Sequence, residues 1–491
     1  MPQSKDDNFK ISEPSLDLSV SRETKNSKLR LFRLLLILIL IFALVPIAAV
    51  GWNDLYKKHV ETTPPEIRLI HFPRGLGLEP VEVKFAVFDL GAGLDSLVVR
   101  VRQKSTSKII LKEKLKGIKS KEYLLTLSKE SFDGFLEGLF YLDIKVFDNA
   151  LWSNAVEESV EMSLDFKRPK LEIISQQHNG RRGGSQLLFY RASDLNLAWS
   201  GVVLSEKVRF KGYPATFLDP EISDSSIFAV VYGLPLDNQV RSPDLKVVAE
   251  DTVGNLSETV FSNRIAERSP RNIKTKISLG AFSKQVDLQK LSLNQDNLEN
   301  QLPTLVENLL EKSEKKLQEA LRSAPSYPAR NFKPLVPAFG TETLSYGDRQ
   351  NLFLNDSAVA SFTSGGNEYS SSNTSELVPA AGDGVVVLSG DFGIYGKMVG
   401  IDHGLGLVSV YGYIREILVK FGDSVETGQA LGRIGFNGFT GAKRIYFSTR
   451  VQGVPVDPRE WMSKGWFEGH ITEKINFLRR SLGMQIFVPF S

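Results

Sequence analysis

Cysteine is absent from this chain of 491 residues. Its absence excludes disulfides, thiolate metal sites and a cysteine nucleophile. Histidine is scarce, and the five present are His59, His71, His178, His403 and His470. Because hydrolytic zinc sites usually take most of their ligands from histidine, this scarcity restricts where such a site could be built.

An excess of charge of either sign is also missing. The formal net charge is +3, so nothing in the composition predicts a nucleic-acid partner. The hydrophobic fraction of 42% and the charged fraction of 24% are typical of folded domains. At roughly 100–200 residues per domain, the length predicts about three of them.

The segment from Leu34 to Asn53 contains no charged residue. At a helical rise of about 1.5 Å per residue, this stretch would span about 30 Å, the thickness of the hydrocarbon layer of a bilayer. Residues 34–53 are therefore predicted to be a transmembrane signal anchor with the lipid bilayer as partner. The Lys and Arg residues before it predict that 1–33 form a cytoplasmic tail.

A cleaved signal peptide is the alternative interpretation of this segment. Its apolar core would be shorter, and no Ala-x-Ala cleavage site is obvious. With either interpretation the bulk of the chain is predicted to lie outside the cytoplasm. The anchor places it at the inner membrane as a single-pass, periplasmic protein.

Alternation of apolar and polar residues predicts two β-sandwich modules, 63–166 and 167–265. The first contains the strand-like runs Val81–Phe88, Ser96–Arg102, Lys108–Leu111, Tyr123–Leu127, Leu139–Phe147 and Val156–Leu164. Each module begins with a proline-led strand and ends at a turn that contains aspartate and asparagine, which is a weak internal repeat. This arrangement resembles tandem bacterial immunoglobulin-like domains. The resemblance implies spacers or binding modules and assigns no site.

The pattern becomes helical over 280–325, the predicted helical connector. One face would carry Leu302, Leu305, Val306, Leu309, Leu310, Leu317 and Leu321. An amphipathic helix of this kind either packs against a neighbouring domain or binds a partner. Both interpretations are open at this point.

Residues 333–462 contain glycines at the intervals that tight turns between short strands require. The characteristic segments are, in order, Val378–Val386, Gly393–Gly396, Ile401–Gly406, Val410–Tyr413, Phe421–Val425, Gly428–Gly432 and Val454–Pro458. Together they resemble the LytM/lysostaphin-type zinc peptidoglycan endopeptidases, also called the duplicated hybrid motif. The resemblance implies a compact β-sheet domain, followed here by a C-terminal extension, 463–491.

In that family a His-x-x-x-Asp motif and the second histidine of a His-x-His motif hold zinc. The first histidine of His-x-His and the histidine of a Tyr-x-His motif serve the attacking water and the transition state. Zinc held in this way lowers the pKa of its water to about 7 and polarises the scissile carbonyl.

This chain departs from the pattern at each of those positions. Ser364 and Glu368 stand where His-x-x-x-Asp is expected, and Tyr413 stands where the histidine of Tyr-x-His is expected. Arg444 and Tyr446 replace the two histidines of His-x-His. No histidine lies between His178 and His403, so no other alignment restores the missing one.

The sequence therefore predicts a mainly β, catalytically inactive protein without zinc or another cofactor. The resemblance extends to degenerate members, some of which activate separate cell-wall amidases. We accordingly expect a module that binds peptidoglycan or a partner, or that regulates a cell-wall hydrolase or synthase. A purely architectural role is a further interpretation. The alternative is an active metalloendopeptidase of peptidoglycan with an atypical metal site.

The five substituted positions have two compatible interpretations. They could line a partner groove, since arginine and tyrosine suit such contacts. They could instead fill the vacated metal pocket, with Arg444 paired to Glu368.

Overall fold

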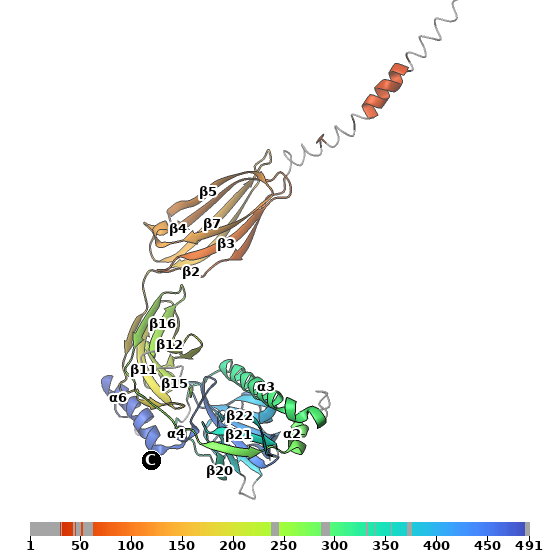
Figure 1. Cartoon of the computed structure of the whole chain (residues 1–491). Helices are drawn as coiled ribbons and strands as arrows, with labels where there is room; N and C mark the ends of the chain where they lie inside the picture. Colours follow the sequence, from red (N-terminus) through yellow and green to blue (C-terminus); the bar gives the residue numbers. More distant parts are fainter. Residues whose placement is uncertain are drawn as a thin grey trace, which may run out of the picture. The chain divides into compact units, whose positions relative to one another are not determined.

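The computed structural model describes residues 30, 32–42, 45, 51–52, 62–236, 245–285, 295–329, 332–337, 339–354, 356–370 and 376–486. The chain divides into two compact units, Met1–Asp165 and Phe166–Ser491 (Figure 1). Strands dominate both units, so the prediction of a mainly β protein is confirmed.

The predicted N-terminal tail and anchor are described only in part. Residues 1–29 and 31 of the tail, and 43–44, 46–50 and 53 of the anchor, lie outside the described residues. Residues 32–42 are helical, and the apolar side chains from Leu34 to Phe42 are exposed. In the described part of the chain, no helix has the length and apolar character needed to cross a membrane.

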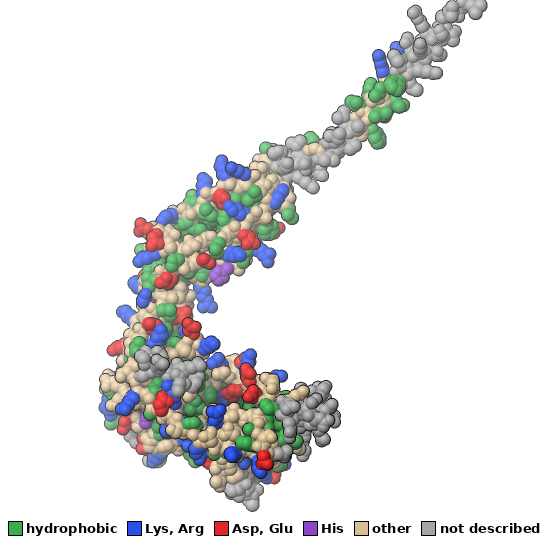
Figure 2. Space-filling model, in the orientation of Figure 1, with side chains coloured by type: hydrophobic (Ala, Val, Ile, Leu, Met, Phe, Trp, Pro, Cys, Tyr) green, Lys and Arg blue, Asp and Glu red, His purple; other side chains and the backbone are tan. Residues whose placement is uncertain are grey.

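The first unit contains two sheets, of order β1-β3-β6 and β2-β8-β7-β4-β5. Their strands are β1 (Glu66–His71), β2 (Gly75–Leu76), β3 (Val81–Phe88), β4 (Leu94–Gln103), β5 (Thr106–Ile118), β6 (Ser120–Leu127), β7 (Gly138–Asp148) and β8 (Ala155–Leu164). Each predicted run lies within one of these strands. Alternate residues of β3, such as Val83 and Phe85, are buried, as a two-faced strand requires. Basic and acidic side chains are interspersed on the face that Figure 2 shows. Immunoglobulin-like character stays a prediction.

The second unit begins with two four-stranded sheets, of order β14-β15-β11-β9 and β13-β12-β16-β17, and a short parallel pair, β10-β18. The strands are β9 (Lys170–Ile173), β10 (Gly180–Arg181), β11 (Ser185–Ser193), β12 (Leu197–Ser205), β13 (Val208–Lys211), β14 (Tyr213–Pro214), β15 (Ile227–Gly233), β16 (Lys246–Asp251), β17 (Leu256–Val260) and β18 (Ile265–Ala266). We call this part of the unit the middle module.

The C-terminal domain is built on a ten-stranded sheet in which β30 pairs with β23, β27, β29 and β31. Its strands are β20 (Thr341–Leu344), β23 (Asn367–Ser370), β24 (Leu377–Pro379), β25 (Gly384–Asp391), β26 (Lys397–Asp402), β27 (Leu407–Ile417), β28 (Ser424–Val425), β29 (Ala430–Phe436), β30 (Lys443–Val451) and β31 (Val454–Val456). A separate sheet joins β19 (Asn272–Lys276), β21 (Arg349–Leu354) and β22 (Ser357–Thr363).

Two helices, α2 (Leu279–Gln285) and α3 (Gln295–Arg322), pack on the C-terminal domain. The predicted apolar face of α3 is the packed one: Leu317 and Leu321 are buried against a cluster that includes Tyr413 and Tyr446. The sequence left open whether this helix packs against a neighbouring domain or binds a partner. In the structure it covers part of the sheet.

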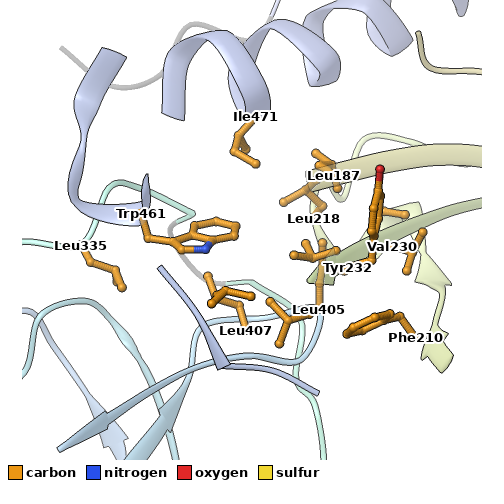
Figure 3. Packing of buried hydrophobic residues seen from close by; sticks show 14 of the residues in the cluster. Leu187, Phe210, Leu218, Val230, Tyr232, Leu335, Leu405, Leu407, Trp461 and Ile471 are labelled. Atoms are coloured by element: carbon orange, nitrogen blue, oxygen red, sulfur yellow. The ribbon is translucent and has the colours of Figure 1, made fainter. Parts of the chain in front are cut away.

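The last helices, α4 (Pro458–Met462), α5 (Lys464–Phe467) and α6 (Glu473–Ser481), return to the middle module. The Lys474 amine donates hydrogen bonds to the Gln186 side chain and to the Leu187 carbonyl, at 3.0 and 2.7 Å. One apolar core runs from the middle module through Trp461 into the C-terminal domain (Figure 3). The two parts of the second unit therefore fold around shared interior side chains.

Candidate functional site

Three adjacent strands bring together four of the five substituted positions. Glu368 on β23 lies directly opposite Tyr446 on β30, and Arg444 lies two residues earlier on β30. Tyr413 lies on β27, whose residue Gly412 pairs with Tyr446. The sheet therefore assembles the constellation that the sequence pattern predicts.

Glu368 is the centre of this group and is 2% exposed. Its Oε1 atom accepts hydrogen bonds from the Tyr413 hydroxyl at 2.8 Å and from the Asn437 amide at 2.9 Å. Its Oε2 atom accepts one from the Arg444 guanidinium at 2.8 Å. The expected pairing of Arg444 with Glu368 is thus present. A buried carboxylate needs such donors, because the charge would otherwise be strongly unfavourable away from water.

Tyr413 is held in an unusual backbone conformation, with φ at 59°. A non-glycine residue in the left-handed region costs of order 1–3 kcal/mol and persists only where surrounding contacts fix it. Here the hydroxyl is fixed by Glu368 and by a 3.0 Å hydrogen bond from Asn437. Burial, followed by the charge of Glu368, raises the pKa of Tyr413 well above its ordinary value. The phenol therefore keeps its proton and acts as a donor.

Tyr446 is also buried, at 2% exposure. Its ring lies 4.8 Å from that of Tyr395 and 6.0 Å from that of Tyr413, measured between ring centroids. Burial raises the pKa of its hydroxyl. Nearby Arg450 and Ser448 lower that pKa, but neither meets hydrogen-bond geometry, and the hydroxyl has no partner among the described residues. A neutral, enclosed phenol is a poor ligand for a metal ion.

Ser364 is the predicted position that lies outside the three strands of this group. Its hydroxyl donates to the Gly366 carbonyl at 2.7 Å, which fixes the turn between β22 and β23. Gly366 is needed there: a Cβ atom would lie 2.7 Å from the Phe447 carbonyl oxygen and 2.8 Å from the Tyr446 ring. Ser364 therefore shapes the loop behind Tyr446.

An ion pair joins the sheet beside this group to the helix α3. Arg450, 0% exposed, donates from both terminal nitrogens to the carboxylate of Glu314 on α3. Glu314 also accepts a 3.3 Å hydrogen bond from Tyr395. Of the five predicted positions, only Arg444 is partly open to solvent, with 23% of its side chain exposed. Tyr413 and Asn437 also line a cavity of about 630 Å³, so a partner could approach the cluster there as well as through Arg444.

The residues at this site do not fit the zinc ion that the family pattern implies. Among the five substituted positions, Glu368 is the only side chain of the kinds that zinc prefers, and both its oxygens are already hydrogen-bonded. The neighbouring carboxylate, Glu314, is paired with Arg450. Arg444 adds a permanent positive charge beside it, which opposes a cation. Within the described residues, no cluster of three histidine, aspartate or glutamate side chains is found here.

His403 and His470, the two histidines nearest to the site in the sequence, have structural roles. Both ring nitrogens of His403 are engaged, with the Asp383 carbonyl at 2.7 Å and with the Ser409 hydroxyl at 2.7 Å. Burial lowers the pKa of His403 to about 4, so the ring is neutral. His470 stacks on Trp466 with ring centroids 4.9 Å apart.

Sequence reasoning missed three members of the site. Asn437 bonds to both Glu368 and Tyr413, although its Asn-Gly context indicates only a turn. Arg450 and Glu314 are separated by 136 residues, and no local pattern links them. Only the alternation along β30, which puts Arg444, Tyr446 and Arg450 on one face, could have suggested Arg450.

The model of peptidase family M23 matches residues 364–458. Residues 364–458 form an M23 domain. The predicted resemblance is thus confirmed for this part of the chain. The match begins at Ser364, the position assigned to the first family histidine, and spans all five substituted positions.

Curated relatives resemble the chain over fewer than a hundred residues each. The murein hydrolase activator EnvC of Escherichia coli is 38% identical over 87 residues, which are 18% of this chain and 21% of the relative. The lipoprotein NlpD/LppB homolog of Pseudomonas aeruginosa is 39% identical over 89 residues, 18% of this chain and 29% of the relative. The chain thus spans between a fifth and a third of the length of these relatives.

Among solved structures, the catalytic domain of lysostaphin from Staphylococcus simulans is 23% identical with a TM-score of 0.21. That match covers 25% of this chain and 92% of the lysostaphin domain.

Proposed function

We propose that this chain is a cell-envelope protein whose M23 domain does not hydrolyse peptidoglycan. It acts instead by binding the wall or a partner, or by regulating a cell-wall hydrolase or synthase. The observation that carries this proposal is the saturation of Glu368 by Tyr413, Asn437 and Arg444. The carboxylate at the family's metal position serves an internal salt bridge.

The chemistry of hydrolysis supports the same conclusion. Metal-assisted hydrolysis needs ligands that fix the ion and an open position for water. Arg444 and Tyr446 supply a cation and a neutral phenol where imidazoles would be needed. The alternative, an active endopeptidase with an atypical metal, has Glu368 as the one suitable ligand among the five substituted positions. A single ligand does not fix a catalytic ion.

The named relatives support a regulatory role. The Escherichia coli relative is called an activator of murein hydrolases. A domain that keeps the fold and replaces the metal ligands retains surfaces through which it can bind another protein. Arg444 is the most exposed of the five substituted positions, and a guanidinium suits carboxylate recognition.

Hydrolysis is tested with the full-length chain and purified peptidoglycan, with added zinc and with a chelator. We expect no soluble fragments under either condition and no bound zinc by elemental analysis. Release that the chelator abolishes would overturn the proposal and establish the endopeptidase.

Regulation is tested by adding the chain to a cell-wall amidase and measuring the rate of wall hydrolysis. We expect stimulation that falls in Arg444→Gln. The matched control is Arg433→Gln, because Arg433 is an exposed arginine that pairs with Glu416 at 3.1 Å. Circular dichroism checks that both variants fold. Equal stimulation by both variants would show that Arg444 does not contribute to the contact with the amidase.

We also propose that residues 34–53 anchor the chain in the inner membrane, with the bulk in the periplasm. The uncharged sequence and the preceding basic residues support this proposal. Protease added to spheroplasts should digest the part after residue 55 and leave the chain's remainder in the membrane fraction. Protection of the whole chain would contradict this topology.

A further inference from the structure

A cavity of about 670 Å³ lies inside the second unit, where the middle module meets the M23 domain. Its lining comes from three places: the segment from β12 to β15 of the middle module, the C-terminal end of α3 with the residues after it, and the M23 domain at β26, the start of β27 and the turn after β30. This volume is in the range of sites for small ligands. None of the five substituted M23 positions lines it.

The two walls of the cavity are joined by a reciprocal pair of hydrogen bonds. The Gln452 side chain accepts from the backbone N–H of Lys211 and donates to the carbonyl of the same residue, both at 2.8 Å. Beneath them, buried side chains of both parts belong to one core. The cavity is therefore preformed, which lowers the ordering cost of binding.

Positive charge dominates the rim. The side chains of Lys211 and Arg322 are exposed and form no ion pair with any described residue. The Arg209 guanidinium lies 4.0 Å from the centre of the Trp199 ring, and its remaining partner is Glu250 at 3.3 Å.

The acidic side chain in the lining does not offset this charge. Asp402 is 2% exposed and accepts a 2.8 Å hydrogen bond from the backbone N–H of Tyr327. Burial raises the pKa of Asp402 to about 7, so near neutral pH much of the group is uncharged. The exposed cations therefore leave the cavity with a net attraction for an anionic ligand.

Aromatic rings form the apolar part of the lining. Tyr213 stacks on Phe217 with ring centroids 5.7 Å apart, and Trp199 and Phe228 are the other rings. Flat aromatic surfaces beside polar groups suit a ligand that has an apolar face and a polar edge. A pyranose ring has this shape, because its axial C–H bonds make a face and its hydroxyls an edge.

We propose that this cavity binds a carboxylate-bearing saccharide, the sugar chemistry of the peptidoglycan strand. The inference deepens the proposed function and rests on it. An extended acidic peptide fits less well: it would add to the edge strand β13, where Gln452 already occupies both backbone groups of Lys211.

The test is calorimetric titration of the full-length chain with the disaccharide of N-acetylglucosamine and N-acetylmuramic acid. The same disaccharide with its carboxyl group amidated is the second probe. We expect the acid to bind at least 10-fold more tightly than the amide, because a charge-assisted hydrogen bond is lost. Equal binding of the two probes, or tighter binding of an acidic peptide, would overturn the proposal.

Variants locate the binding. Lys211→Gln and Arg322→Gln should each weaken binding of the acid about 10-fold and leave the amide nearly unchanged, whereas Trp199→Leu should weaken both. The controls are Lys464→Gln and Trp152→Leu, which remove an 84% exposed lysine side chain and a 66% exposed tryptophan elsewhere. Weakening by the controls to the same extent would show that the cavity is not the site.

This experiment is separable from the test of the proposed function. A chain that releases wall fragments but binds the disaccharide through Arg322 would overturn only the inactivity of the M23 domain. A chain that is inactive and binds neither disaccharide would overturn only the saccharide cavity.

Discussion

We predict that removing Arg450 and removing Glu314 destabilise the protein by different amounts, although the two residues form the same ion pair. The two partners differ in exposure: the Arg450 side chain is 0% exposed, whereas that of Glu314 is 37% exposed. Removing one partner of a buried pair costs about 3–5 kcal/mol, chiefly because the other charge is left without compensation. The cost should therefore depend on which charge remains.

Glu314→Met leaves the fully buried guanidinium of Arg450 unpaired, so we expect the upper end of that range, about 5 kcal/mol. Arg450→Met leaves Glu314, which water and the Tyr395 hydroxyl can still solvate, so we expect about 3 kcal/mol. In the double variant neither charge remains. Its cost should be smaller than the sum of the two single costs.

The assay is hydrogen exchange of α3 amides in the full-length chain, because a local opening of this helix need not unfold the rest. At about 1.4 kcal/mol per factor of ten, Arg450→Met should accelerate exchange about 100-fold. Glu319→Met is the matched control, since Glu319 is an exposed acidic residue of the same helix and should cost within about 0.5 kcal/mol. Strictly additive single effects, or a larger effect for Arg450→Met than for Glu314→Met, would refute the reasoning.

Three further predictions concern the shared core and its titrating groups. Burial lowers the pKa of Lys474 to about 7 from 10.5, so the native state binds fewer protons than the unfolded chain between these values, and stability should rise with pH across that window. Lys474→Met should remove this slope in urea midpoints measured against pH. Burial raises the pKa of Asp402 to about 7 from 3.8, so stability should fall as pH rises through that lower window, and Asp402→Asn should flatten the same plot there. Trp461→Ala should cost about 3–5 kcal/mol in urea unfolding, because the indole is 0% exposed. A cost below about 1 kcal/mol would mean that Trp461 does not join the two parts of the core.

Strands with one buried face could be predicted well from the sequence. The run Val81–Phe88 was expected as a strand, and β3 has the same bounds. Alternation carries this information locally, because successive side chains of a strand point to opposite faces. The helical periodicity over 280–325 likewise located α3, with the apolar face correctly placed.

Assembly of the site could be predicted only as far as the family pattern reaches. That pattern placed Glu368, Tyr413, Arg444 and Tyr446 together. It did not indicate that α3 packs beside them, because hydrophobic periodicity shows which face is buried and not what buries it. Nor did it predict that Arg444 is the most exposed of the five positions, since burial at this site depends on tertiary packing.

The second β-sandwich module, 167–265, and the peptidase-like domain, 333–462, were predicted as separate segments with a helical connector between them, and the structure places all of them in one unit. The contacts within this unit join residues that are far apart in sequence: Gln452 of the M23 domain bonds to Lys211, and Lys474 of the C-terminal extension bonds to Gln186. Both involve single polar side chains on otherwise ordinary segments. Contacts of this kind leave no periodic signal.

The return of α6 to β11 has a consequence for how the chain is made. Synthesis proceeds from the N-terminus, and domains generally fold as they emerge. The middle module cannot do so completely, because β11 finds the partner of its Gln186 and Leu187 only when Lys474 has been synthesised. A stretch of 288 residues must therefore be synthesised and, with the proposed topology, exported before this contact can form, and a product that ends before α6 could not complete it.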